Sequence, residues 1–398
     1  MAMIPGRAMV EDASFAAHLR AAAPDRQVEA MVGYLRTRLG VSGADVLLAD
    51  YRIAGLWGVL DSTTSGRIPL TGQDAAARCF SSQQALVDTG PRGVRLYVPV
   101  TVWGERVGVL VVELAEPPSD VLAGRLNVLA GDLALALRAA DRDTDRYRRV
   151  RRRGRLSMAA ELQWELIPGR SLWHDSYLLA GQLEPAYTVG GDNFDWAVND
   201  DRLTVTAVNG DGTGLPASLL TALAVNAMRN ARRSGGSLAE QAELASDTIF
   251  QHHRGERHLA TVLLELDFHT GRVQAVDAGS PRVMRVRGGE VHRISLEEQL
   301  PLGMFEEGRY SSQEFWIEPG DRLFVVTDGV YAAAPGEREP YGDRVLAKAI
   351  RSTRLQPATE AVGTVMRDLR DYHDDTELDD DAVIVCLDWH GMKTERLG

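Results

Sequence analysis

The chain has 398 residues, of which 44 % are hydrophobic and 25 % charged, with a formal net charge of -12. This length predicts two or three domains of a soluble globular protein, and the acidic balance argues against nucleic acid as a partner. No apolar run reaches the roughly 20 residues of a membrane span, and the first residues lack a secretory signal. Cys79 and Cys386 form neither a disulfide framework nor a zinc motif, which favours the reducing cytoplasm.

The N-terminal third predicts a helix, a set of strands and a second helix. The first helix ends at Gly40, and its apolar face consists of Val28, Met31, Val32, Leu35 and Leu39. Strand-like runs follow, and Gly104 with Glu105 predicts the turn of a hairpin. The second helix begins near Ser119, with leucines spaced three or four residues apart as far as Leu137.

This order of elements over residues 25–140 resembles a GAF sensory domain. The resemblance implies an α/β sensor for an unknown small ligand or a partner protein. A ligand-free dimerisation domain is the alternative, and no residue in the stretch distinguishes the two. Residues 1–24 precede it as an N-terminal extension.

Residues 141–170 are predicted to form a helical linker that continues the leucine-spaced helix. The run from Arg146 to Arg155 is densely basic, and Gly154 inside it predicts a bend. Nucleic-acid binding is one interpretation of such a run. Because the chain is acidic and no aromatic platform accompanies the arginines, a solvated helical linker that pairs with an acidic surface or with a second copy is favoured. A homodimer through this linker helix is expected.

Residues 171–392 alternate β-rich runs with two clear helices. One helix opens near Pro216 and ends at Gly235, and the next carries a capping box of Ser237 and Glu240. Hairpins lie before and after this helix pair. The pattern predicts a largely antiparallel α+β domain with helices packed on sheet.

Four polar residues lie at strand boundaries of this domain. They are Asp192, Asn209, Asp328 and Asp380. If the strands meet at one sheet end, these oxygen-bearing side chains converge, and such donors suit a hard divalent cation. The alternative is that each is an ordinary turn residue, favoured there for its backbone hydrogen bonds.

Six motifs in order resemble those of the metal-dependent protein phosphatases (protein phosphatase 2C-like) of the bacterial SpoIIE or RsbU type. They are PAYTVGGDNFD, NGDGTGLPASLLTA, DAGSPRVMRV, LPLGMF, GDRLFVVTDGVYAA and DDDAVIV, within residues 157–389. The resemblance implies an α-β-β-α sandwich in which two β-sheets pack face to face with helices outside.

The resemblance also implies a chemistry. Members of this family hold two Mn²⁺ or Mg²⁺ ions whose bridging water hydrolyses phosphoserine or phosphothreonine, usually in an anti-anti-sigma factor of the STAS fold. Asp192, Asp328 and Asp380 match catalytic metal-ligand positions, and Gly210 matches the position whose carbonyl binds metal. Asp195 matches a supporting acid of the first motif.

The chain departs from the family at several of these positions. Asn209 stands where the resemblance places the aspartate that bridges both metals, and an amide offers an oxygen without negative charge. We expect weaker metal binding, with one ion or none. Asp211 is a candidate replacement ligand or an ordinary turn residue. Thr213, Asp277, Ser280 and Ala332 also differ from the family's usual residues.

Two hypotheses follow, with a weaker third. The first is an active phosphatase gated by the GAF-like part. The second is a pseudophosphatase, a scaffold that binds its partner without dephosphorylating it. The third is a nucleotide-binding sensor without a protein partner.

Overall fold

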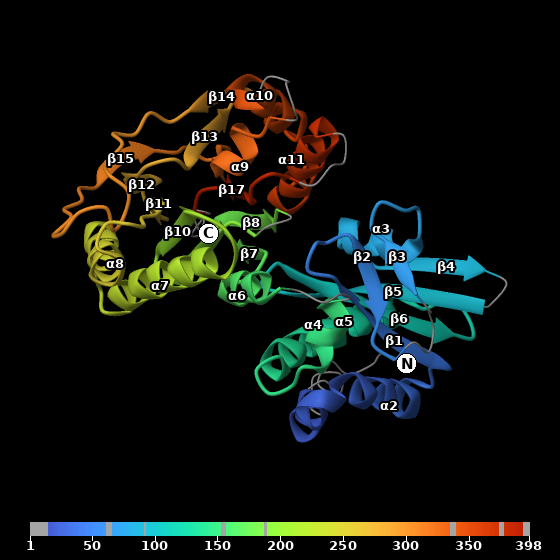
Figure 1. Cartoon of the computed structure of the whole chain (residues 1–398). Helices are drawn as coiled ribbons and strands as arrows, with labels where there is room; N and C mark the ends of the chain where they lie inside the picture. The colour runs from blue at the N-terminus through green and yellow to red at the C-terminus, as the bar shows by residue number, and fades with distance from the viewer. Residues whose placement is uncertain are drawn as a thin grey trace. The chain divides into compact units, whose positions relative to one another are not determined.

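A computed structural model describes residues 15–60, 66–90, 93–152, 157–186, 189–334, 340–373 and 378–392. The chain divides into two compact units, residues 1–155 and 156–398, so the division falls inside the predicted linker (Figure 1). No helix in the described ranges is both long and apolar enough to cross a membrane.

The first unit is built on a six-stranded antiparallel sheet in the order β3-β2-β1-β6-β5-β4. Its strands are β1 (Gly43–Ala49), β2 (Gly55–Gly58), β3 (Arg67–Pro69), β4 (Leu86–Gly90), β5 (Gly93–Val102) and β6 (Glu105–Leu114). The predicted hairpin is confirmed as β5 and β6. Its turn is Trp103 and Gly104, both with positive φ, one residue earlier than expected.

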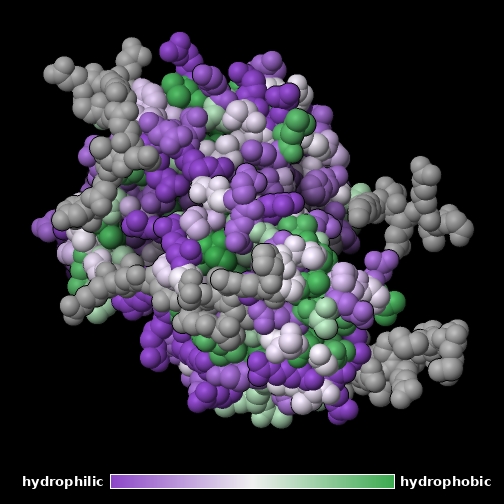
Figure 2. Space-filling model, turned by 90° about the vertical axis from the view of Figure 1, so that its right-hand side faces the viewer, coloured by the Kyte–Doolittle hydropathy of each residue, from purple (hydrophilic) through white to green (hydrophobic). Residues whose placement is uncertain are grey.

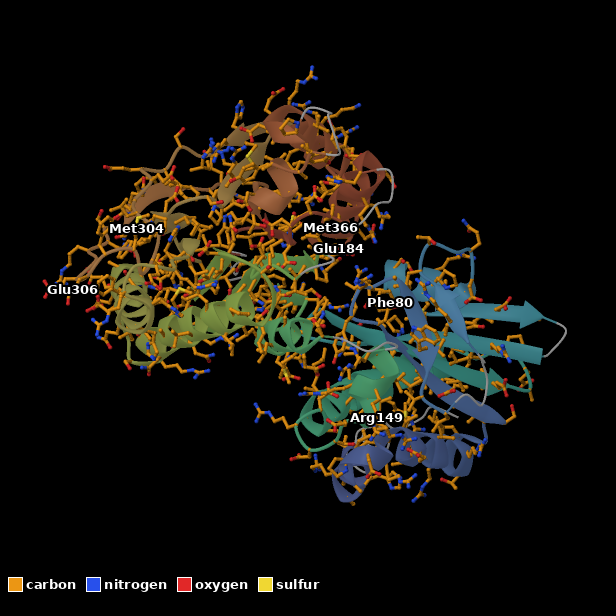
Figure 3. All side chains as sticks on the ribbon, in the orientation of Figure 1. Phe80, Arg149, Glu184, Met304, Glu306 and Met366 are labelled. Atoms are coloured by element: carbon orange, nitrogen blue, oxygen red, sulfur yellow. The ribbon has the colours of Figure 1, made fainter. Side chains whose placement is uncertain are left out.

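Helices cover both faces of this sheet. On one face lie residues 15–21, the short helix η1 (Pro24–Arg26), α2 (Gln27–Leu39), α4 (Asp120–Ala140) and α5 (Arg146–Arg152); on the other lies α3 (Ala75–Ser82). Figure 3 labels Phe80 of α3 and Arg149 of α5, which come from opposite sides. The predicted ends are confirmed: Gly40 terminates α2 at φ 67°, and Ser119 caps α4. Phe15 belongs to the core, so the predicted extension contributes to packing.

The prediction that α4 continues as one helix through the linker is wrong. After Ala140 the chain turns, and α5 packs back on the first unit because Tyr147 is buried in its core. The Tyr147 hydroxyl accepts from the Gln27 amide at 3.0 Å and donates to the Pro24 carbonyl at 3.1 Å. Arg146 pairs with Glu29 at 2.6 Å. Gly154 lies outside the described residues.

The second unit begins with α6 (Met158–Leu166) and contains two antiparallel sheets. One has the order β15-β12-β11-β10-β9, formed by β9 (Asn193–Asn199), β10 (Arg202–Asn209), β11 (Ala260–Asp267), β12 (Arg272–Ala278) and β15 (Gln313–Trp316). The other has the order β14-β13-β16-β17-β8-β7, formed by β7 (Ser171–His174), β8 (Tyr177–Glu184), β13 (Arg282–Arg287), β14 (Glu290–Arg293), β16 (Arg322–Val326) and β17 (Ala382–Trp389).

The two sheets pack face to face and helices cover their outer faces (Figure 1). Helices α7 (Gly214–Arg233) and α8 (Leu238–His253) pack on the first sheet; α10 (Gly342–Ser352) and α11 (Ala358–Tyr372) pack on the second. One apolar core therefore lies between the sheets and one under each helix pair. The predicted α+β class and α-β-β-α layering are confirmed.

Local sequence signals account for several boundaries of the second unit. Ser237 and Glu240 form both hydrogen bonds of the predicted capping box at the start of α8. Helix α7 begins at Gly214, two positions before the predicted Pro216. Figure 2 shows one face of the molecule, where hydrophobic residues lie in small groups among hydrophilic ones, as on ordinary protein surfaces.

Candidate functional site

The four predicted site residues lie at strand ends of the two facing sheets. Asp192 directly precedes β9, and Asn209 is the last residue of β10. Asp328 begins the short helix α9 (Asp328–Tyr331) after β16, and Asp380 precedes β17. Since β9 and β10 are neighbours in one sheet and β16 and β17 in the other, the sandwich gathers chain segments that are far apart in sequence.

Asp192 is fully buried. Its Oδ1 accepts from the Gly210 amide at 3.0 Å, and the Thr327 side chain also donates to its carboxylate. Its Oδ2 is buried and finds no hydrogen-bond partner in the described structure. Burial, and then the neighbouring charge of Asp381, raises the pKa of Asp192 well above its ordinary value. A carboxylate so placed gains stability from a proton or a cation.

Two consecutive aspartates before β17 have different surroundings. Taken as a whole residue, Asp380 is exposed to solvent, but its carboxyl group is partly buried. This burial, with the charges of Asp328 and Asp381, raises the pKa of Asp380 to about 6. Asp381 is fully buried, and it accepts from the Ala186 amide at 2.8 Å and from Gln163 Nε2 at 2.5 Å. The hydrogen bonds of Asp381 hold it within the fold, whereas Asp380 faces the other carboxylates.

Asp328 completes the group of interacting carboxylates. It is partly buried, and its Oδ1 has no hydrogen-bond partner among the described residues. Thr327, directly before it, donates to Asp192 and accepts from the Val383 amide at 3.0 Å. The segment from β16 into α9 is thereby tied to β17 in its own sheet and to the start of β9 in the facing sheet.

Glycines allow the backbone segments of the site to approach closely. A Cβ atom on Gly210 would collide with the backbone of Gly191, and one on Gly190 would lie 2.7 Å from Asp380 Oδ1. The Thr221 hydroxyl, from α7, donates to the Gly191 carbonyl at 2.5 Å. Glycine is therefore required here for steric reasons, beyond its preference for turns.

The side chain of Asn209 is directed to the turn between β12 and β13. Its Nδ2 donates to Ser280 Oγ at 2.6 Å, and Ser280 in turn contacts the Tyr331 hydroxyl at 3.2 Å. Asn209 is 8 % exposed. The amide nitrogen is thus engaged by Ser280, a residue that the sequence singled out only as a departure from the family.

The other two predicted acids differ in their contacts. Asp211 is partly buried and makes no hydrogen bond or ion pair with a described residue. Asp195, on β9, binds Arg229 at 2.8 Å and Arg232 at 2.9 Å, with its side chain 4 % exposed. The paired arginines agree with the supporting position expected of Asp195.

The chemistry of the site suits a divalent cation, although its side chains do not enclose one as they stand. Within the described ranges, no group of three or more His, Cys, Asp or Glu side chains is arranged to hold a metal ion. A bound cation would give a partner to the unpaired oxygens of Asp192 and Asp328. It would also offset the negative charge that contributes to the raised pKa of Asp380. A cation would have to draw these carboxylates together.

Residues that sequence reasoning missed hold these acids in place. They are Gln163, Thr327 and Asp381. The one available signal was the position of Gln163 in the AAELQWELIP segment, whose resemblance pointed to the domain without indicating a contact. Tyr187 and Thr188 of the first motif lie outside the described residues.

Comparison with known families identifies this part of the chain. The model of the family described as stage II sporulation protein E (SpoIIE) matches residues 199–390. Residues 199–390 are a SpoIIE-family domain. The match includes Asn209, Asp328 and Asp380, and Asp192 lies just before it.

The individual proteins to which the chain is similar are distant relatives. The phosphoserine phosphatase RsbP of Bacillus subtilis (strain 168) is 30 % identical over 84 residues, so the chain spans 21 % of that relative's length. The RsbU and RsbW domains of a Mycobacterium tuberculosis protein have 20 % identity and a TM-score of 0.48, over 57 % of this chain and 63 % of theirs. The SiaA PP2C domain of Pseudomonas aeruginosa has 22 % identity and a TM-score of 0.48, over 53 % and 85 %.

Proposed function

We propose that the chain is a Mn²⁺- or Mg²⁺-dependent phosphoserine/phosphothreonine protein phosphatase of bacterial partner-switching signalling. The observation that carries the proposal is a pair of buried carboxylate oxygens without partners, on Asp328 within the SpoIIE-family domain and on Asp192 just before it. Buried charges are normally paired or bound to metal, so unpaired ones at strand ends favour a cation site.

The proposed ligands are Asp192, Asp328 and Asp380, with the Gly210 carbonyl as a further oxygen donor. A bound divalent cation would acidify a water and offset charge on the phosphoryl oxygens. The family expectation is two ions; the loss of one charge at Asn209 favours fewer. Asp211 remains a candidate ligand, because its carboxylate has no other partner in the described structure.

The remaining residues of the site orient the ligands. Gly210 and Thr327 each donate to Asp192, which leaves its Oδ2 as the oxygen free for a cation. Asp381 is occupied by the Ala186 amide and by Gln163, so its position supports Asp380 rather than replacing it. Hydrogen bonding of this kind fixes a carboxylate before metal arrives, which raises affinity.

The name of one relative supports a substrate class. RsbP carries the name phosphoserine phosphatase, and we extend that to a phosphoprotein substrate here, an anti-anti-sigma factor of the STAS fold being the first candidate. The GAF-like first unit is proposed to gate the activity, and a homodimer to form around residues 141–170. The antiparallel sheet with helices on both faces supports a sensor-type first unit without naming its ligand.

Hydrolysis of a phosphoserine peptide with Mn²⁺, compared between the wild type and Asp328→Ala, tests the activity. We expect metal-dependent turnover in the wild type and loss in the variant. Asp201→Asn, at an exposed turn, is the matched control and should retain wild-type turnover. Equal background rates in the wild type and in Asp328→Ala would contradict the proposal.

A second candidate function is a regulator that binds the phosphoprotein without hydrolysing it. The contact of Asn209 with Ser280 favours it, because the amide at the bridging position is engaged elsewhere. Phosphopeptide binding measured by fluorescence anisotropy, together with absent turnover, would support this function. Turnover gained only in Asn209→Asp would identify the missing charge as its cause.

A further inference from the structure

A directional chain of hydrogen bonds begins at Asn209. Its Nδ2 donates to Ser280 Oγ at 2.6 Å, and the Tyr331 hydroxyl donates its only proton to the Ser280 carbonyl at 2.9 Å. The remaining contact, 3.2 Å between Ser280 Oγ and Tyr331 Oη, is therefore a donation from serine to tyrosine. The Ser280 and Tyr331 hydroxyls each have one defined partner for their single proton, and one hydrogen of the Asn209 amide is directed to Ser280.

The middle of this chain has an unusual backbone. Ser280 adopts φ 47°, in the left-handed region that residues with a Cβ rarely occupy, and Gly279 before it has φ 92°. Such a conformation persists only where the surroundings impose it, and it often marks a functional site. The surroundings here are Asn209, Tyr331, and Asp277, whose Oδ1 accepts from the Gly279 amide at 3.0 Å.

The series of hydrogen bonds that begins at Asn209 ends at α9, the short helix that carries Asp328. Tyr331 is the last residue of α9 and Asp328 the first. The guanidinium of Arg282 lies 3.4 Å from the centre of the Tyr331 ring and pairs with Asp343 at 2.5 Å. The tyrosine is therefore fixed from its ring face as well as from its hydroxyl.

Asn209, at the start of this series of hydrogen bonds, is next to the residue that binds Asp192. Gly210, the next residue after Asn209, donates its amide to Asp192 at 3.0 Å. Asn209 thus links two parts of the site. The backbone amide of the next residue, Gly210, binds Asp192. The side chain of Asn209 is connected through Ser280 and Tyr331 to α9, the helix that begins with Asp328. A carboxylate at position 209 could not donate a hydrogen bond to Ser280 in this way.

We propose that Asn209 is a positioning residue, which holds α9 and therefore Asp328 in place by donating to Ser280, and that it is not a metal ligand. This inference rests on the proposed function in taking Asp192, Asp328 and Asp380 as the groups that hold the cation. It also connects two positions at which the sequence differs from the family resemblance, 209 and 280, because the amide and the hydroxyl are hydrogen-bond partners.

The experiment compares Asn209→Ala, Ser280→Ala and the double variant in the full chain, with Asn226→Ala as control because Asn226 is an exposed asparagine on α7. Mn²⁺ affinity is measured by calorimetry. The ring Cζ resonance of Tyr331 is measured by NMR, assigned by its loss in Tyr331→Phe. Asn209→Asp, which keeps the shape but removes the donor, serves as a second variant should Asn209→Ala fold poorly.

We expect Asn209→Ala, Asn209→Asp and Ser280→Ala all to move the Tyr331 resonance, while the control leaves it unchanged. Mn²⁺ affinity should fall by a similar factor in Asn209→Ala and Ser280→Ala, by about tenfold or less, as for one lost hydrogen bond. The double variant should lose little more than either single variant, since both act on one chain of contacts.

A different pattern would overturn the inference. If Asn209→Ala loses Mn²⁺ binding as fully as Asp328→Ala does, while Ser280→Ala binds normally and the Tyr331 resonance stays in place, Asn209 is a ligand. If the wild type binds no Mn²⁺, the proposed function fails by that result. The Tyr331 resonance then still tests the positioning role of Asn209. If this resonance does not move in Asn209→Asp and Ser280→Ala, the proposed series of hydrogen bonds from Asn209 to Tyr331 is contradicted.

Discussion

Gln163 of α6 donates its side-chain amide to Asp381 at 2.5 Å, across 218 positions of sequence. The same Nε2 donates to the Asp192 carbonyl at 3.1 Å, and Asn193 returns a hydrogen bond to the Gln163 carbonyl at 3.1 Å. One fully buried glutamine therefore joins the first helix of the second unit to two strands at the carboxylate site.

Gln163→Leu should destabilise the second unit and weaken Mn²⁺ binding together. The buried Asp381 carboxylate loses a donor, which costs about 2–3 kcal/mol of unfolding free energy. Urea denaturation followed by tryptophan fluorescence, with calorimetry of Mn²⁺ binding, measures both effects. Gln251→Leu, at an exposed position of α8, should change neither quantity. Wild-type stability in Gln163→Leu would show that the contact is not formed.

Asp195→Asn should cost about 3–5 kcal/mol of unfolding free energy, because it removes the charge between two nearly buried arginines, Arg229 and Arg232. The same substitution at Asp201, whose side chain is 64 % exposed beside His269, should change stability by about 0.5 kcal/mol or less. Urea midpoints of the two variants provide the comparison. Similar midpoints would show that burial does not strengthen the Asp195 contacts.

Gly210→Ala should destabilise the fold by about 1–3 kcal/mol or more, because the added Cβ meets the Gly191 backbone, which has no flexible end to move aside. Gly363→Ala provides the opposite case in the same unit. Gly363 is inside α11, and its Cβ would make only ordinary contacts, so alanine should stabilise by about 0.5–1 kcal/mol. Relative to the wild type, we expect a lower thermal midpoint in Gly210→Ala and a higher one in Gly363→Ala.

The metal-free protein should lose stability as the pH rises from about 4 to about 7. The pKa of Asp380 is raised from 3.8 to about 6, so its carboxyl binds a proton more tightly in the folded chain than in the unfolded one. Stability from this proton is complete below the unfolded pKa and is lost as the pH passes the folded pKa. Asp380→Asn should make the thermal midpoint less dependent on pH over this range, as measured by calorimetry with a chelator present. A steeper dependence in the variant would contradict the assignment.

Local patterns predicted the elements well because they depend on neighbouring residues. The capping box at Ser237 and the left-handed Gly40 each form within one turn of chain, so periodicity and residue type suffice. The linker helix was the failure. Its continuity was extrapolated from helix spacing, whereas burial of Tyr147 against a segment 120 positions earlier turned the chain back.

The sequence by itself determined the family of the second unit, its layers, and the acids Asp192, Asp328 and Asp380 as candidates at strand ends. Only the tertiary structure decided the partners of these groups. It paired Asn209 with Ser280 across 71 positions and Gln163 with Asp381 across 218. The physical reason is that a side-chain hydrogen bond depends on which strand ends meet in the sandwich, and residue spacing along the chain carries no information about that meeting.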